Sequence, residues 1–92
     1  MFVAVIIEMS NEDHEIAVDK ILKLYGFKPN GKYIYESNTI GETTLTRLKR
    51  EIDKVSDSYD IVNFYQYPIE GTLVVTTLAK KKWHRRIMQQ EE

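Results

Sequence analysis

Glu8 is the side chain whose type and position most clearly suggest chemistry. It closes the apolar, β-branched run Phe2–Ile7 and stands just before Ser10, where a helix is predicted to begin. A carboxylate at the mouth of a buried strand needs either a cation or hydrogen-bond donors. Two interpretations therefore stay open: Glu8 holds a divalent metal such as Mg²⁺ and acts as a catalytic residue, or it accepts hydrogen bonds from the start of the helix.

Basic side chains form two further groups that suggest contact with phosphates. Residues 80–86 carry five of the 13 basic side chains, although the net charge of the chain is only -1. A second group, Arg47, Arg50 and Lys54, is spaced by three and four residues along a predicted helix. A solvated helix face, with Glu51 paired to Arg47, and a solubilising terminus are the alternatives. The predicted nucleic-acid-binding residues are Arg47, Arg50, Lys54, Lys80, Lys81, Lys82, Arg85 and Arg86.

The elements that must position these residues alternate between strand and helix. Residues 2–8 are predicted to form a strand, and Ser10 is predicted to cap a helix, with Asp13 as the reciprocal carboxylate of a capping box. Gly26 follows Tyr25 and is expected to end that helix.

The second half of the pattern begins at a turn. Asn30-Gly31 predicts a tight turn between a short segment, which Pro29 marks as an edge, and a strand over 33–36. An apolar stripe predicts a helix from residue 42 or 43 to 55, and strands are expected over 59–65 and 72–78.

This order predicts an α+β, ferredoxin-like βαββαβ domain, in which two helices cover one face of an antiparallel sheet. The strand over 72–78 is an extra C-terminal strand, so residues 1–79 form the domain and 80–92 a basic C-terminal tail. An unpaired strand at a sheet edge invites a second chain, which predicts a homodimer.

Composition narrows the class of protein. The 92 residues allow one small domain, and the lack of cysteine excludes disulfides and thiolate metal sites and fits a cytoplasmic location. No apolar run is long enough to span a membrane. His14 and His84 have no second His or Cys at metal-ligand spacing, so neither is expected to be a metal ligand. Trp83 is expected to anchor the tail on an apolar patch, ahead of stacking on a base or packing under a partner.

Five motifs follow one another in an order that is typical of one family. They are Ile7-Glu8-Met9-Ser10, Tyr25-Gly26, Tyr33-Ile34-Tyr35-Glu36, the basic helix Leu45–Ile52 and the strand Asp60–Pro68. Together they resemble the CRISPR-associated Cas-two proteins, small ferredoxin-like dimers of the spacer-acquisition machinery in antiviral defence. The family usually has a metal-binding Asp where this chain has Glu8.

The resemblance implies a function. It implies a structural subunit that bridges CRISPR integrase subunits and duplex DNA during spacer acquisition, with hydrolysis secondary or absent. The alternative is a Mg²⁺-dependent endonuclease acting on RNA or double-stranded DNA, in which Glu8 from two copies meets at the dimer axis. A toxin-like ribonuclease or a regulatory domain on the same scaffold is a third expectation, because a fold does not fix a function.

Overall fold

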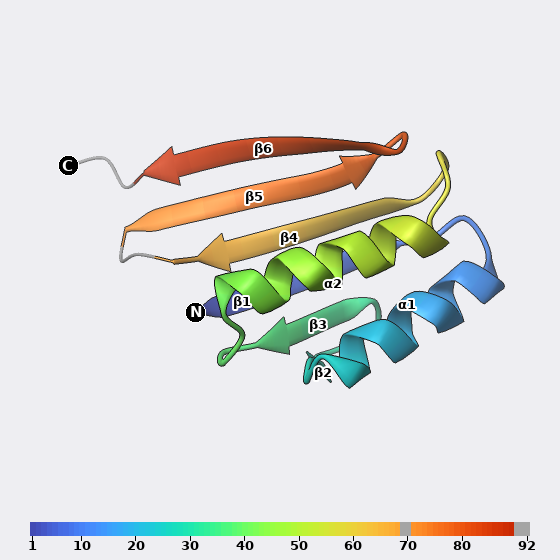
Figure 1. The fold of residues 1–92 in the computed structure, drawn as a ribbon, viewed down its shortest axis with the longest axis horizontal. Coiled ribbons are helices and arrows are strands. Elements are labelled where there is room, and N and C mark those ends of the chain that lie inside the picture. The colour runs from blue at the N-terminus through green and yellow to red at the C-terminus, as the bar shows by residue number, and fades with distance from the viewer. Residues whose placement is uncertain (69–70, 90–92) are drawn as a thin grey trace.

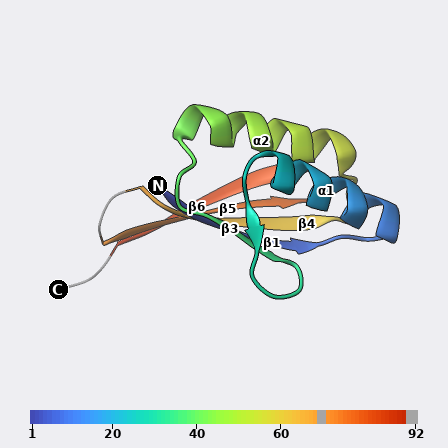
Figure 2. The ribbon, with the colours of Figure 1, turned by 90° about the horizontal axis from the view of Figure 1, so that it is seen from below.

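Two helices pack on one face of a six-stranded antiparallel sheet in the computed structural model, which describes residues 1–68 and 71–89 (Figures 1 and 2). The elements are β1 (Phe2–Glu8), α1 (Glu12–Leu24), β2 (Lys28–Pro29), β3 (Ile34–Ser37), α2 (Glu42–Val55), β4 (Ile61–Tyr67), β5 (Thr72–Ala79) and β6 (Lys82–Gln89). The spatial order is β2-β3-β1-β4-β5-β6. The first four strands form the ferredoxin-like sheet, which confirms the predicted fold class.

The core lies between the helices and the first strands. Val3, Val5 and Ile7 of β1 face the helices and are almost completely buried, while the residues between them point to the other side of the sheet. Helix α2 contributes Leu45, Leu48 and Ile52 to the same core. The predicted apolar stripe is therefore confirmed. No helix in residues 1–68 and 71–89 combines the length and apolar character needed to cross a membrane.

The start of α1 differs from the prediction, because Asn11 and not Ser10 caps the helix. The Asn11 side chain accepts a hydrogen bond from the His14 backbone N–H at 2.9 Å, whereas the Ser10 backbone N–H donates to Asp60 Oδ1 at 2.7 Å. Asp13 thus lies inside the first turn and is not the reciprocal member of a capping box. Gly26, with φ of 85°, follows the helix as predicted.

The C-terminal third contains the largest departure from the expected pattern. The strand predicted over 59–65 is β4 at Ile61–Tyr67, because Asp60 is used as a buried hydrogen-bond acceptor before the strand begins. The segment expected as a tail pairs with β5 from Ala79↔Lys82 to Thr72↔Gln89 and forms β6. Residues 90–92 of that segment lie outside the described residues.

Strand β5 is consequently an interior strand. It pairs with β4 on one side and β6 on the other, so it offers no free edge to a second chain. On this side of the sheet the edge strand is β6, which extends beyond the area that the helices cover in Figure 1; the opposite edge strand is β2.

Candidate nucleic-acid interface

The predicted basic stripe of α2 lies on the exposed side of that helix. Arg47, Arg50 and Lys54 are exposed, while the buried residues of α2 face the sheet. Among residues 1–68 and 71–89, no carboxylate comes within 4.0 Å of their charged nitrogens, and so Arg47 does not pair with Glu51. These three charges are therefore available to an external anion.

The basic residues of β6 divide between the two faces of the sheet. Directly paired residues of antiparallel strands lie on the same face. Arg85 pairs with Thr76, whose hydroxyl meets a side chain of α2, so Arg85 points to the helix side. Lys82 and Arg86 alternate with it and point to the face that carries no helix.

A tight turn joins β5 to β6. Lys80 and Lys81 have φ of 54° and 61°, the left-handed conformation that both central residues adopt in a two-residue turn of type I′. The twist of this turn matches that of the strands, and it carries two of the predicted nucleic-acid-binding lysines to one corner of the sheet.

Asp53 fastens this hairpin to α2. Its carboxylate accepts from Lys81 Nζ at 2.6 Å and from the Trp83 indole N–H at 3.1 Å. The hydrogen bond from Lys81 outweighs the effect of burial and holds the pKa of Asp53 below its usual value. The Trp83 ring packs against Phe64 with centroids 5.9 Å apart, which confirms the predicted anchoring on an apolar patch. Lys81 is therefore less available to an external anion than the other basic residues of the hairpin.

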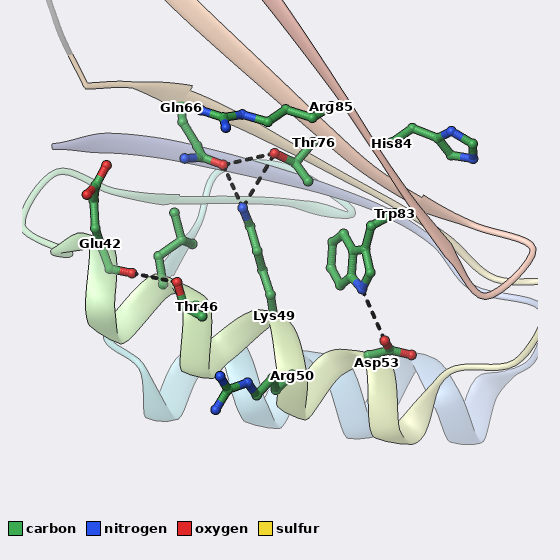
Figure 3. Close-up of a pocket in the computed structure, with 11 residues that line it drawn as sticks. Glu42, Thr46, Lys49, Arg50, Asp53, Gln66, Thr76, Trp83, His84 and Arg85 are labelled. Carbon is green, nitrogen blue, oxygen red and sulfur yellow. Dashed lines mark hydrogen bonds between the residues drawn. The ribbon is translucent and has the colours of Figure 1, made fainter.

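A groove of about 520 Å³ lies between α2 and the sheet; we call it the α2–β6 groove (Figure 3). Lys49 and Arg50 of α2 and Arg85 of β6 line it, together with Gln66 of β4 and Thr76 of β5. The fold thus brings a member of the α2 stripe and a member of the β6 segment to one concave surface, although 35 positions separate Arg50 from Arg85 in the sequence.

Lys49 is the most unusual residue of the groove. Its ammonium group donates to Gln66 Oε1 at 2.8 Å and to Thr76 Oγ1 at 3.4 Å, and it lies 5.4 Å from the centre of the Phe64 ring. Within the described part of the chain no carboxylate lies within 4.0 Å of it. Burial, with a smaller contribution from the charge of Arg85, lowers the pKa of Lys49 to about 8.

Lys49, Gln66 and Thr76 were not among the predicted nucleic-acid-binding residues. Lys49 directly follows Leu48 and comes four residues after Leu45, so its helical position borders the buried stripe. That spacing was a usable signal for a lysine that reaches under the helix. Its partners on β4 and β5 become neighbours only through the strand register, which the sequence pattern does not give.

Glu8 ends β1, as predicted, and its side chain is exposed on the face without helices. Its position pairs with Ile61 of β4. In residues 1–68 and 71–89, the one group of three potential metal ligands is His14, Asp57 and Asp60, whose ligand atoms lie within 4.8 Å of one another. Glu8 is not part of that group.

The His14–Asp57–Asp60 group is occupied by its own hydrogen bonds. Asp60 is completely buried, and its carboxylate accepts from the backbone N–H groups of Ser10 and Asp57 and contacts His14 Nδ1 at 2.7 Å. Burial alone raises the pKa of Asp60, but these hydrogen bonds outweigh it and hold the pKa below its usual value. Mg²⁺ prefers an octahedron of oxygen ligands and would have to displace these donors, so this group does not fit it. The site predicted at the dimer axis would therefore receive the exposed carboxylate of Glu8 from each of the two chains.

Comparisons of the chain with protein-family models, with curated proteins and with solved structures gave no match.

Proposed function

We propose that this protein is a nucleic-acid-binding scaffold that contacts the phosphate backbone of duplex DNA through α2 and β6. The observation that carries the proposal is the placement of two basic residues around one groove: Arg85 of β6 lies on its sheet side, and Arg50 of the exposed α2 stripe lies on its helix side with its side chain directed outwards. A row of cations without carboxylate partners matches a phosphate backbone, whose charges repeat along each strand.

The motif resemblance extends this proposal to a role in the cell. On that basis the chain is a subunit of CRISPR spacer acquisition that acts in the cytoplasm as a homodimer and bridges integrase subunits and DNA. The exposed edge of β6 and the face of the sheet without helices support contact with a second protein chain. Co-purification with an integrase subunit tests this role, and a chain that never retains one contradicts it.

Binding of a fluorescent DNA duplex across a salt series tests the proposed surface. The triple variant Arg47→Gln/Arg50→Gln/Lys54→Gln is expected to bind more weakly and to lower the slope of log affinity against log salt by about three for each chain in contact. The matched control is Lys20→Gln/Lys28→Gln/Lys32→Gln, which removes three exposed cations from α1 and the β2–β3 region. Equal weakening by both variants would contradict a role for the α2 stripe.

The same samples separate the scaffold from the alternative endonuclease. With Mg²⁺ added, a denaturing gel reports whether the strands are cut. DNA that remains intact at a saturating concentration of the protein supports the scaffold function. Metal-dependent fragments that disappear in Glu8→Ala would instead assign the chemistry to Glu8.

A further inference from the structure

We propose that the α2–β6 groove binds a nucleotide, with Lys49 and Arg85 as partners of its phosphate monoester and the Trp83 ring beside its base. This inference goes beyond the scaffold function, because it concerns a small ligand held inside the groove and requires no duplex.

The positive charge inside the groove is unbalanced. Lys49 reaches beneath α2, where its ammonium group donates to the neutral oxygens of Gln66 and Thr76 and lies over the uncharged Phe64 ring. Arg85 lines the same space and lies close enough to disfavour the charge on Lys49. Two neighbouring cations, one of them half-buried, repel each other unless an anion sits between them.

The acidic residues of the groove do not supply that anion. Asp53 is already bound to Lys81 and to the Trp83 indole. Glu42 lies seven residues before Lys49, about 10 Å away along the helix axis. A phosphate monoester carries close to two negative charges and three acceptor oxygens, which suits a lysine and an arginine placed side by side.

The size and the lining of the groove also suit a nucleotide. Its volume of about 520 Å³ falls within the range of small-molecule sites, and its sheet side carries an aromatic ring. In Figure 3 the Trp83 ring lies on the sheet side of the groove, and the Lys49 side chain stands between this ring and Gln66. The side chains of Arg50 and His84 point away from the groove. Trp83 is 37% exposed and is held by Phe64 and Asp53, so a fixed aromatic surface is available for a base to stack on.

Trp83 provides the readout, because it is the single tryptophan of the chain. Its indole N–H gives one resonance in a ¹⁵N-correlated NMR spectrum, which can be followed during titration of the full chain with adenosine 5′-monophosphate. We expect a saturable shift of this resonance, and binding of adenosine at least about tenfold weaker because it lacks the phosphate. Absence of a saturable shift up to about 10 mM nucleotide would overturn the proposal.

Variants locate the phosphate. Lys49→Met and Arg85→Gln are each expected to weaken binding of adenosine 5′-monophosphate about tenfold or more. Lys20→Met, an exposed lysine of α1, is the matched control and should leave the affinity unchanged. Equal affinity in wild type and Lys49→Met, with both chains folded by circular dichroism, would overturn the assignment.

Two more titrations identify the source of the nucleotide. A 5′-phosphorylated single-stranded DNA that binds more tightly than its 5′-hydroxyl form assigns the site to a DNA end, whereas equal weak binding of both assigns it to a free mononucleotide. Inorganic phosphate that binds as tightly as the nucleotide would overturn the role of the base. The variant Arg47→Gln/Lys54→Gln changes two exposed cations that do not line the groove, so it should weaken duplex binding and leave the affinity for adenosine 5′-monophosphate unchanged, and the two proposals can fail independently.

Discussion

Asp60 is one carboxylate that connects three parts of the chain. It accepts hydrogen bonds from Ser10, two residues before α1, and from Asp57 in the loop after α2, and it contacts His14 inside α1. Because the side chain is completely buried, each of these donors would lose its partner if the carboxylate were removed. The residue therefore orders the end of the sheet at which Glu8 stands.

Replacing this carboxylate should change both stability and its response to acid. We expect Asp60→Ala to reduce the free energy of unfolding by about 3 kcal/mol. The pKa of Asp60 is lowered in the folded state, so its contribution is present above the unfolded pKa of about 3.9 and is lost as pH falls through the folded pKa. Denaturant unfolding between about pH 5 and pH 2 should thus show a smaller acid loss in Asp60→Asn than in wild type.

The control for this experiment is Asp13→Asn, an exposed carboxylate of the first turn of α1. Part of the acid loss will remain in Asp60→Asn, because the pKa values of Asp19 and Asp53 are also lowered. An acid response of Asp60→Asn identical to that of Asp13→Asn would contradict the role assigned to Asp60.

Lys49 should also make stability rise with pH, but in the alkaline range. Its pKa falls from 10.5 to about 8 in the folded chain, so the unfolded chain binds more protons between these values. This contribution should make the stability of wild type rise between about pH 8 and pH 10, below the range in which the raised pKa of Tyr35 acts in the opposite direction, and the rise should be smaller in Lys49→Met. At pH 7 we expect Lys49→Met to be as stable as wild type or more stable, as measured by urea unfolding. A loss of more than about 2 kcal/mol would mean that the ammonium group is structural.

The hairpin β5–β6 is the element that the sequence pattern described least well. The strand over 72–78 and both helices are confirmed, because apolar periodicity reports burial directly. Residues 82–89 were missed as a strand because their charges conceal the alternation, with Trp83, Arg85 and Ile87 on one face. The exposure of Arg47, Arg50 and Lys54 followed from the helical period. The groove could not be predicted from that period, because it depends on which strands are neighbours in the sheet.

The turn of this hairpin offers a test through backbone conformation. Lys80 has φ of 54°, a conformation that is unfavourable for a side chain with a Cβ atom by about 1 to 2 kcal/mol. Lys80→Gly should therefore raise the free energy of unfolding by about 0.5 kcal/mol, after allowance for the greater freedom of glycine in the unfolded chain. Lys82→Gly places the same change at the first residue of β6, which pairs with Ala79, and should lower stability by about 0.5 kcal/mol. Thermal unfolding measures both, and shifts of the same sign would contradict the argument.

The molecule as a whole has one covered and one uncovered sheet face (Figure 2). Phe2, Tyr67 and Met88 are exposed on the uncovered face, 37%, 48% and 44% respectively, and the first two rings lie 5.8 Å apart. These residues come from β1, β4 and β6, near the end of the sheet at which β1 begins and β6 ends. This apolar face replaces the predicted β5 edge as the basis for the proposed dimer.

Charge substitution on this face tests the dimer. Tyr67→Lys and Met88→Lys are expected to shift the protein towards the monomer in sedimentation velocity runs over a concentration series. Ile16→Lys is the control, since Ile16 is an apolar residue of α1 that is 57% exposed on the other side of the sheet. A dimer that persists in both variants would place the interface elsewhere.

The strand order also sets the sequence in which the molecule can assemble. Strand β1 lies at the centre of the sheet, and its partner β4 becomes available only once the chain has been made as far as Tyr67. Strands β5 and β6 then add through short connections, each to the strand made just before it. The α2–β6 groove is therefore the last feature to form during synthesis and, if folding is retraced, the first to open. Hydrogen exchange should detect that opening in the β6 amides while β1 is still protected.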